Sequence, residues 1–102
     1  MIPVEKVKSI VQTYEKLEKE LSSGTIDKKD FVKKSKEYSN IGEIIEAAKA
    51  YIKFEKEKED LEKIIKDKNV DKDMVNLATN ELEELVKKKL DNEKKLKVFL
   101  LP

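Results

Sequence analysis

The chain has 102 residues, a length that suits one ordinary domain with a modest core. Charged side chains make up 44% of it, hydrophobic ones 38%, and two glycines and two prolines leave few turns, which argues against an all-β fold. The near balance of 23 basic and 22 acidic side chains excludes a global field that would steer the chain to nucleic acid or an anionic membrane.

Several residue types that carry chemistry are missing. There is no cysteine, which excludes disulfides and thiolate metal sites, and no histidine, the commonest general base. Glu43 and Glu46, like Glu81 and Glu84, share a helix face, but a di-metal bundle also needs histidine. Every basic residue is lysine, which lacks the planar guanidinium group with which arginine makes paired hydrogen bonds to base edges. We therefore expect no enzyme, no catalytic, cofactor-binding or metal-ligating residue, and no DNA partner.

The chain shows no signal for a membrane or for export. No segment approaches the ~20 apolar residues of a membrane span. Met1–Glu5 has no basic flank followed by an apolar stretch, so no signal peptide is visible. We therefore expect a cytoplasmic protein without a membrane partner.

The first half of the chain predicts two helices. Apolar residues recur at three- and four-residue steps after Pro3, which predicts an amphipathic helix over residues 4–22. Gly24 follows as its natural left-handed cap, and Asp27 is a good N-cap for a second helix. The run Ser39–Gly42 interrupts the second pattern, and there the helix either kinks or breaks.

The second half continues the helical pattern. The apolar stripe resumes at Ile41, crosses a wholly charged stretch at residues 55–60 and closes at residues 66–69, after which Asp71 caps a last helix. We therefore expect an all-α fold, an elongated antiparallel bundle of three or four helices with coiled-coil character, with residues 1–102 as a single helical domain. The predicted core consists of Val7, Val11, Tyr14, Leu17, Leu21, Phe31, Tyr38, Ile44, Ala48, Tyr51, Leu82, Leu85 and Leu96.

Two surface features could bind nucleic acid. The six aromatic residues could stack on single-stranded bases, but their helical spacing among aliphatic residues favours core packing. The lysines at 87–89, with Lys94 and Lys95, could touch phosphates, but the acidic residues beside them favour a solvated helix face. The function class that fits best is a non-catalytic interaction module.

Two parts of the chain resemble a known family. The first runs from Tyr14–Leu21 to Asp30–Tyr38, which reads Asp-Phe-Val-Lys-Lys-Ser-Lys-Glu-Tyr. The second contains Met74–Ala78, Glu81–Leu85 and the closing Leu100–Pro102. Together they resemble the N-terminal helical domain of bacterial peptide chain release factors, and the Leu-Leu-Pro ending is similar to that of release factor 1.

The resemblance implies a part in translation termination at stop codons. In the family, one domain reads the stop codon, and another promotes peptidyl-tRNA hydrolysis through a Gly-Gly-Gln loop. This chain contains neither a stop-codon-reading tripeptide nor a Gly-Gly-Gln sequence. The matched region would position the factor near the stalk base of the large ribosomal subunit. The implied partners are the ribosome, through a stalk-base protein and rRNA, and the remaining domains of the full-length factor.

The end of the chain and its composition leave other hypotheses open. The apolar run Val98–Leu101 before Pro102 predicts that the chain is the N-terminal fragment of a longer protein. A free-standing coiled-coil adaptor or tether without a role in translation is the alternative. An RNA-binding helical module is a third class, which the lack of arginine disfavours.

Overall fold

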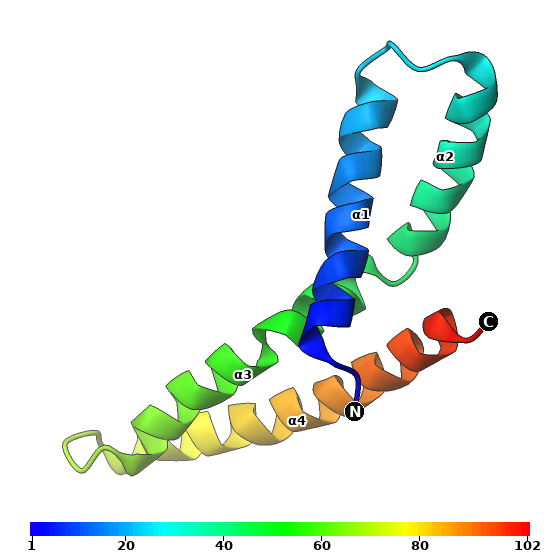
Figure 1. Ribbon diagram of the computed structural model, residues 1–102. Helices are drawn as coiled ribbons and strands as arrows, with labels where there is room; N and C mark the ends of the chain where they lie inside the picture. The colour runs from blue at the N-terminus through cyan, green and yellow to red at the C-terminus, as the bar shows by residue number, and fades with distance from the viewer.

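Four helices account for nearly all of the chain. The structure is a computed structural model that describes residues 1–102 and contains no strand (Figure 1). The helices are α1 (Val4–Ser22), α2 (Lys28–Gly42), α3 (Ile45–Lys66) and α4 (Lys72–Leu100). The all-α prediction and the first helix predicted at residues 4–22 are both confirmed. None of the four has an apolar stretch of the length that crossing a membrane requires.

The helices form two hairpins that meet at an angle. Helices α1 and α2 make one hairpin, α3 and α4 make the longer one, and α1 packs against the first part of α3 (Figure 1). The backbones of α2 and α4 do not approach each other. The molecule therefore measures 60 × 28 × 19 Å with a radius of gyration of 18.3 Å, against about 13 Å for a compact domain of this length. This confirms the elongated antiparallel bundle.

Capping residues fix the helix boundaries. The Asp27 carboxylate accepts a hydrogen bond from the Asp30 N–H at 2.9 Å, and the Asp71 carboxylate accepts one from the Met74 N–H at 2.9 Å. Each bond satisfies one of the unpaired N–H groups at a helix start. Gly24 has φ 73°, in the left-handed region where glycine meets no steric penalty. The three caps expected from the sequence are confirmed.

The interruption near Gly42 is a break. Helix α2 ends at Gly42, and Ile44 has φ −120° and ψ 5°, outside the helical range. The N–H groups of Glu43 and Ile44 still donate to the carbonyls of Asn40 and Ile41, at 3.3 and 3.0 Å. These two bonds keep the turn between α2 and α3 tight, and α3 leaves it in a new direction (Figure 1).

The core is small and lies where the hairpins meet. Only 12 of the 102 residues are buried, which follows from the extended shape. One group, here called the junction cluster, joins α1, α3 and α4 and consists of Ile2, Val7, Ala48, Tyr51 and Leu96. A second group joins the first hairpin to the start of α3 and consists of Ile10, Leu17, Ile41 and Ile45. Phe99 and Leu100 of α4 also pack against this second group.

The predicted core is confirmed in part. Val7, Leu17, Ala48, Tyr51 and Leu96 are buried, whereas Val11, Tyr14, Leu21, Tyr38, Ile44, Leu82 and Leu85 are half-buried. The prediction that Phe31 belongs to the core is wrong, because 46% of this residue is exposed. The first turn of α2 has only α1 beside it, so no third helix covers the Phe31 side chain. The prediction omitted Ile2, Ile10, Ile41, Ile45, Ala47, Phe54 and Ala78, which are buried.

Candidate functional site

The lysines singled out in the sequence do not form one basic patch. Consecutive residues of a helix point about 100° apart, so the run at residues 87–89 is spread around α4. Lys87 pairs with Glu84 at 3.7 Å, while the Lys89 ammonium lies 4.9 Å from the centroid of the Phe54 ring. That distance gives a cation–π contact, so Lys89 serves packing between α3 and α4. Lys88 and Lys89 line the same surface together with Glu81 and Glu84, so carboxylates accompany the lysines of this run.

The aromatic residues are mostly packed. Tyr51 and Phe54 are buried, which confirms core packing for them. Tyr14 of α1 and Tyr38 of α2 stack with ring centroids 4.4 Å apart and planes 13° apart. Hydrogen bonding to the Tyr14 side chain, with partial desolvation, raises the pKa of Tyr38 to about 12. Phe31 alone stays largely uncovered, so no row of rings is available for stacking bases.

The start of the chain is fastened at the junction of the hairpins. The Tyr51 hydroxyl donates to the Ile2 carbonyl at 2.7 Å and accepts from the Ile2 N–H at 3.1 Å. The Met1 amine lies 3.4 Å from a Glu93 carboxylate oxygen, which also pairs with Lys97 at 3.3 Å. Hydrogen bonds from Lys97 and the amine lower the pKa of Glu93. These bonds tie the beginning of α1 to both α3 and α4.

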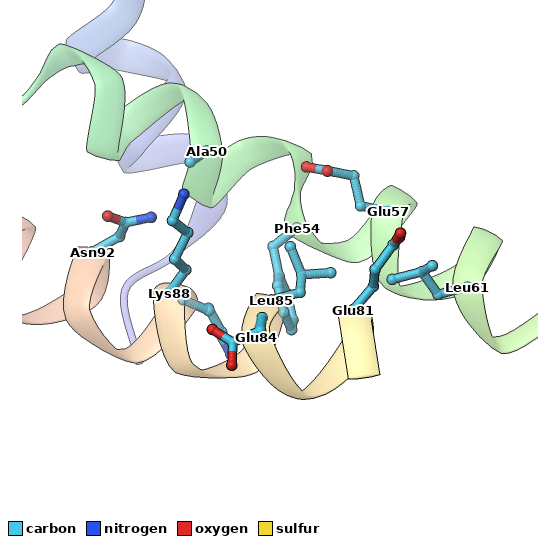
Figure 2. A pocket seen from close by; sticks show the side chains of 10 residues that line it. Ala50, Phe54, Glu57, Leu61, Glu81, Glu84, Leu85, Lys88 and Asn92 are labelled. Atoms are coloured by element: carbon cyan, nitrogen blue, oxygen red, sulfur yellow. The ribbon is translucent and has the colours of Figure 1, made fainter. Parts of the chain in front are cut away.

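A groove runs between α3 and α4 on the long hairpin (Figure 2). Its volume is about 450 Å³, and its apolar lining comes from Ala50, Phe54 and Leu61 of α3 and Leu85 of α4. The polar lining consists of Glu57, Glu81, Glu84, Lys88, Lys89 and Asn92. The carboxylates do not gather into a group that could hold a metal ion. The groove is thus an apolar slot between charged rims.

The sequence reasoning missed this groove. The helical pattern predicts Leu85 in the core, and it treats Glu81 and Glu84 as a carboxylate pair without a histidine and as part of a solvated helix face. One signal that could have revealed it is Ala50, a small residue on the α3 face that lines the groove. A small residue opposite the long Lys88 side chain leaves space that neither helix fills.

The chain matches a known family along almost all its length. A family model described as the PCRF domain matches residues 10–102. A protein named Peptide chain release factor 1 from Pelagibacter ubique (strain HTCC1062) is 50% identical over 105 residues. Proteins of the same name are 40% identical over 98 residues in Wolbachia pipientis subsp. Culex pipiens and 34% identical over 101 residues in Caldicellulosiruptor saccharolyticus. No solved structure gives a significant match.

The matches cover the chain and a minor part of each relative. They include 100%, 94% and 97% of this chain but only 29%, 27% and 28% of the three relatives. The chain therefore spans less than a third of the length of the curated proteins it matches. The resemblance to release factor 1 noted in the sequence is confirmed, and the chain belongs to the PCRF domain family.

Proposed function

We propose that this chain is the helical domain of a class I peptide chain release factor and takes part in translation termination at stop codons, in the cytoplasm. The observation that carries the proposal is the 50% identity over the whole chain to a protein named Peptide chain release factor 1. The match extends over the whole chain and so includes all four helices, which means that it concerns the whole unit rather than one motif. The proposal includes the ribosome and the remaining domains of the longer factor as partners.

Within the factor, the proposed role is to position it near the stalk base of the large ribosomal subunit. The 60 Å length and the angle between the hairpins suit a part that spans two contacts (Figure 1). The surface carries lysines and carboxylates of both signs, which can make screened contacts with rRNA and a stalk-base protein. The surface has no arginine guanidinium group that could make paired hydrogen bonds to bases. The domain would thus contribute binding and leave codon choice to the rest of the factor.

The positioning role can be tested with the relative from Pelagibacter ubique. Deleting its segment that matches this chain should weaken ribosome binding or slow termination at every cognate stop codon, and more so at low salt. Replacing the segment with residues 1–102 should restore the rate. A changed preference among stop codons, with ribosome affinity intact, would mean that the domain reads sequence and would overturn the proposal.

The proposed domain has no catalytic role of its own. Its 102 residues contain no histidine, no cysteine and no Gly-Gly-Gln sequence. Purified chain added to ribosomes programmed with a stop codon should release no peptide above background. Release at a rate comparable to that of a complete factor would contradict this part of the proposal.

A further inference from the structure

The residues along the α3–α4 groove recur with the spacing of a helix-packing seam. On α3 they are Ala50, Phe54, Glu57 and Leu61. On α4 they are Glu81, Glu84, Leu85, Lys88, Lys89 and Asn92. The α3 residues follow steps of four, three and four residues, the repeat with which coiled-coil helices pack knobs into holes. The same steps join Glu81, Leu85, Lys88 and Asn92 on α4, with Glu84 and Lys89 beside that row. Such a set covers about 16 Å, three turns of helix. The hairpin thus presents two parallel ridges on which a third helix fits.

The apolar lining of the groove is partly open to solvent. Leu61 and Leu85 are half-buried and contribute to the lining, and Phe54 lies beneath them, covered by Lys89. A volume of about 450 Å³ lies within the usual range for binding clefts. It has room for two or three apolar side chains from a partner. Burying those side chains would remove apolar surface from water on both sides.

Charge is divided along the groove. Glu57 and Glu81 lie toward the Leu61 end, and Lys88 and Asn92 lie toward the Ala50 end (Figure 2). Neither of these two carboxylates nor Lys88 takes part in an ion pair, although Glu84 beside them pairs with Lys87. Unpaired charges of opposite sign at the two ends orient a partner that carries the complementary pattern.

We propose that this groove binds an amphipathic helix of a protein partner. The helix carries apolar anchors at steps of four and three residues, a cationic residue beside Glu57 and Glu81, and an anionic residue beside Lys88. This is recognition of a helix in a groove, with the third helix completing a seam that α3 and α4 leave open. The proposal goes beyond the function proposed above and is tested on the isolated chain, so either can fail without the other.

The test uses a synthetic 18-residue helical peptide with leucines at those steps, lysines at one end and glutamates at the other. In heteronuclear NMR titrations of the chain, it should shift the amide signals of Ala50, Leu61 and Lys88 saturably. Two further peptides keep the leucines and carry either lysines or glutamates at both ends. Each should bind about two- to five-fold more weakly, the effect of a mismatched exposed charge pair.

Variants of the chain separate the groove from other surfaces. Ala50→Leu should fill the slot and weaken binding at least about ten-fold, as expected when an apolar anchor is displaced. Replacing both Glu57 and Glu81 by lysine should reverse the preference in favour of the peptide with glutamates at both ends. Glu83→Lys, on the opposite side of α4, is the matched control and should leave binding unchanged. Circular dichroism checks that each variant folds. If Ala50→Leu does not fold, Lys88→Glu provides a second test of the groove.

Four results would overturn the proposal, and a fifth would overturn the orientation assigned to the partner helix. The first is the absence of saturable shifts, and the second is equal binding of all three peptides. The third is a stronger shift of the same signals by an unstructured RNA oligonucleotide. The fourth is sedimentation showing that a second copy of the chain occupies the groove without peptide. Retained binding in the double lysine variant with unchanged preference would likewise contradict the assigned orientation.

Discussion

At the scale of single residues, position decides what a hydrophobic side chain contributes. Leu96 and Leu90 lie on the same helix, yet Leu96 is fully buried in the junction cluster and Leu90 is 53% exposed. A buried leucine contributes by leaving water and by contacting many atoms, and an exposed one does neither. The two residues therefore form a matched pair for measuring the junction.

Truncating Leu96 should be costly and truncating Leu90 should not. Leu96→Ala leaves a cavity between α1, α3 and α4 and should lower the free energy of unfolding by about 2–5 kcal/mol. Leu90→Ala should change it by less than about 0.5 kcal/mol. Urea unfolding followed by circular dichroism measures both. Equal losses would show that α4 is rotated differently about its axis.

Glu93 should make the fold sensitive to acid. Its folded-state pKa lies below the ordinary value of 4.5 because Lys97 and the Met1 amine donate hydrogen bonds to the carboxylate. A lowered pKa gives stability that is present above pH 4.5 and is lost as the pH falls through the folded-state value. Urea midpoints should therefore drop less on acidification in Glu93→Gln than in the unaltered chain.

Glu83→Gln is the control for this titration. Glu83 lies on α4 and is exposed, without an ion pair in the structure. Its replacement should leave the acid-induced drop unchanged. If the two variants behave alike between pH 5 and pH 3, Glu93 is not the group responsible.

At the scale of elements, local chemistry could be predicted and packing only partly. The helix over residues 4–22, the caps at Asp27 and Asp71 and the role of Gly24 depend on neighbours within a few residues. Burial depends on which helices meet, and no local pattern contains that information. Phe31 continued a helical stripe but faces no third helix.

The same limit explains the buried residues that were missed. Ile2 is buried because the Tyr51 hydroxyl bonds its backbone and holds the start of the chain against α3. Ile45 is buried because the chain turns sharply after Gly42. The α3–α4 groove was missed for a related reason. It is a space between two helices, and its charged rims resemble ordinary solvated helix faces in the sequence.

The two glycines should respond in opposite directions to alanine. Gly24 has φ 73°, so Gly24→Ala forces an L side chain into the left-handed region and should cost about 1–2 kcal/mol. Gly42 ends α2, and an added Cβ would lie 3.8 Å from Cε1 of Tyr14, an ordinary contact. Gly42→Ala should therefore stabilise the chain by about 0.4–1 kcal/mol. Thermal and urea unfolding of both variants measures the two signs.

At the scale of the whole molecule, two small clusters hold the two hairpins at an angle. The hydroxyl of Tyr51 bonds both backbone groups of Ile2, and the surrounding junction cluster contains residues from α1, α3 and α4. Away from this junction, each hairpin has only its own two helices to rely on. Stability should therefore be concentrated at the junction and fall toward the two hairpin tips.

Removing the Tyr51 hydroxyl tests this picture. Tyr51→Phe leaves the Ile2 N–H and carbonyl without partners and should lower the free energy of unfolding by about 1–3 kcal/mol. Hydrogen exchange followed by mass spectrometry should show faster exchange at the start of α1. Tyr38→Phe, which keeps the stacked ring, is the control and should leave exchange there unchanged. Uniform acceleration along the chain would argue against a local fastening.

The burial of Leu96 has a consequence for how the chain folds during synthesis. Val7 and Ala48, which share its cluster, leave the ribosome well before it. At about 5–20 residues per second, several seconds pass before α4 is long enough to cover them. During that interval the first hairpin can form from its own local contacts, but its apolar base stays open to water or to a chaperone. The fold is thus complete only when the last turns of α4 have been synthesised. A ribosome paused shortly before Leu96 would carry a nascent chain whose junction cluster is still exposed to solvent.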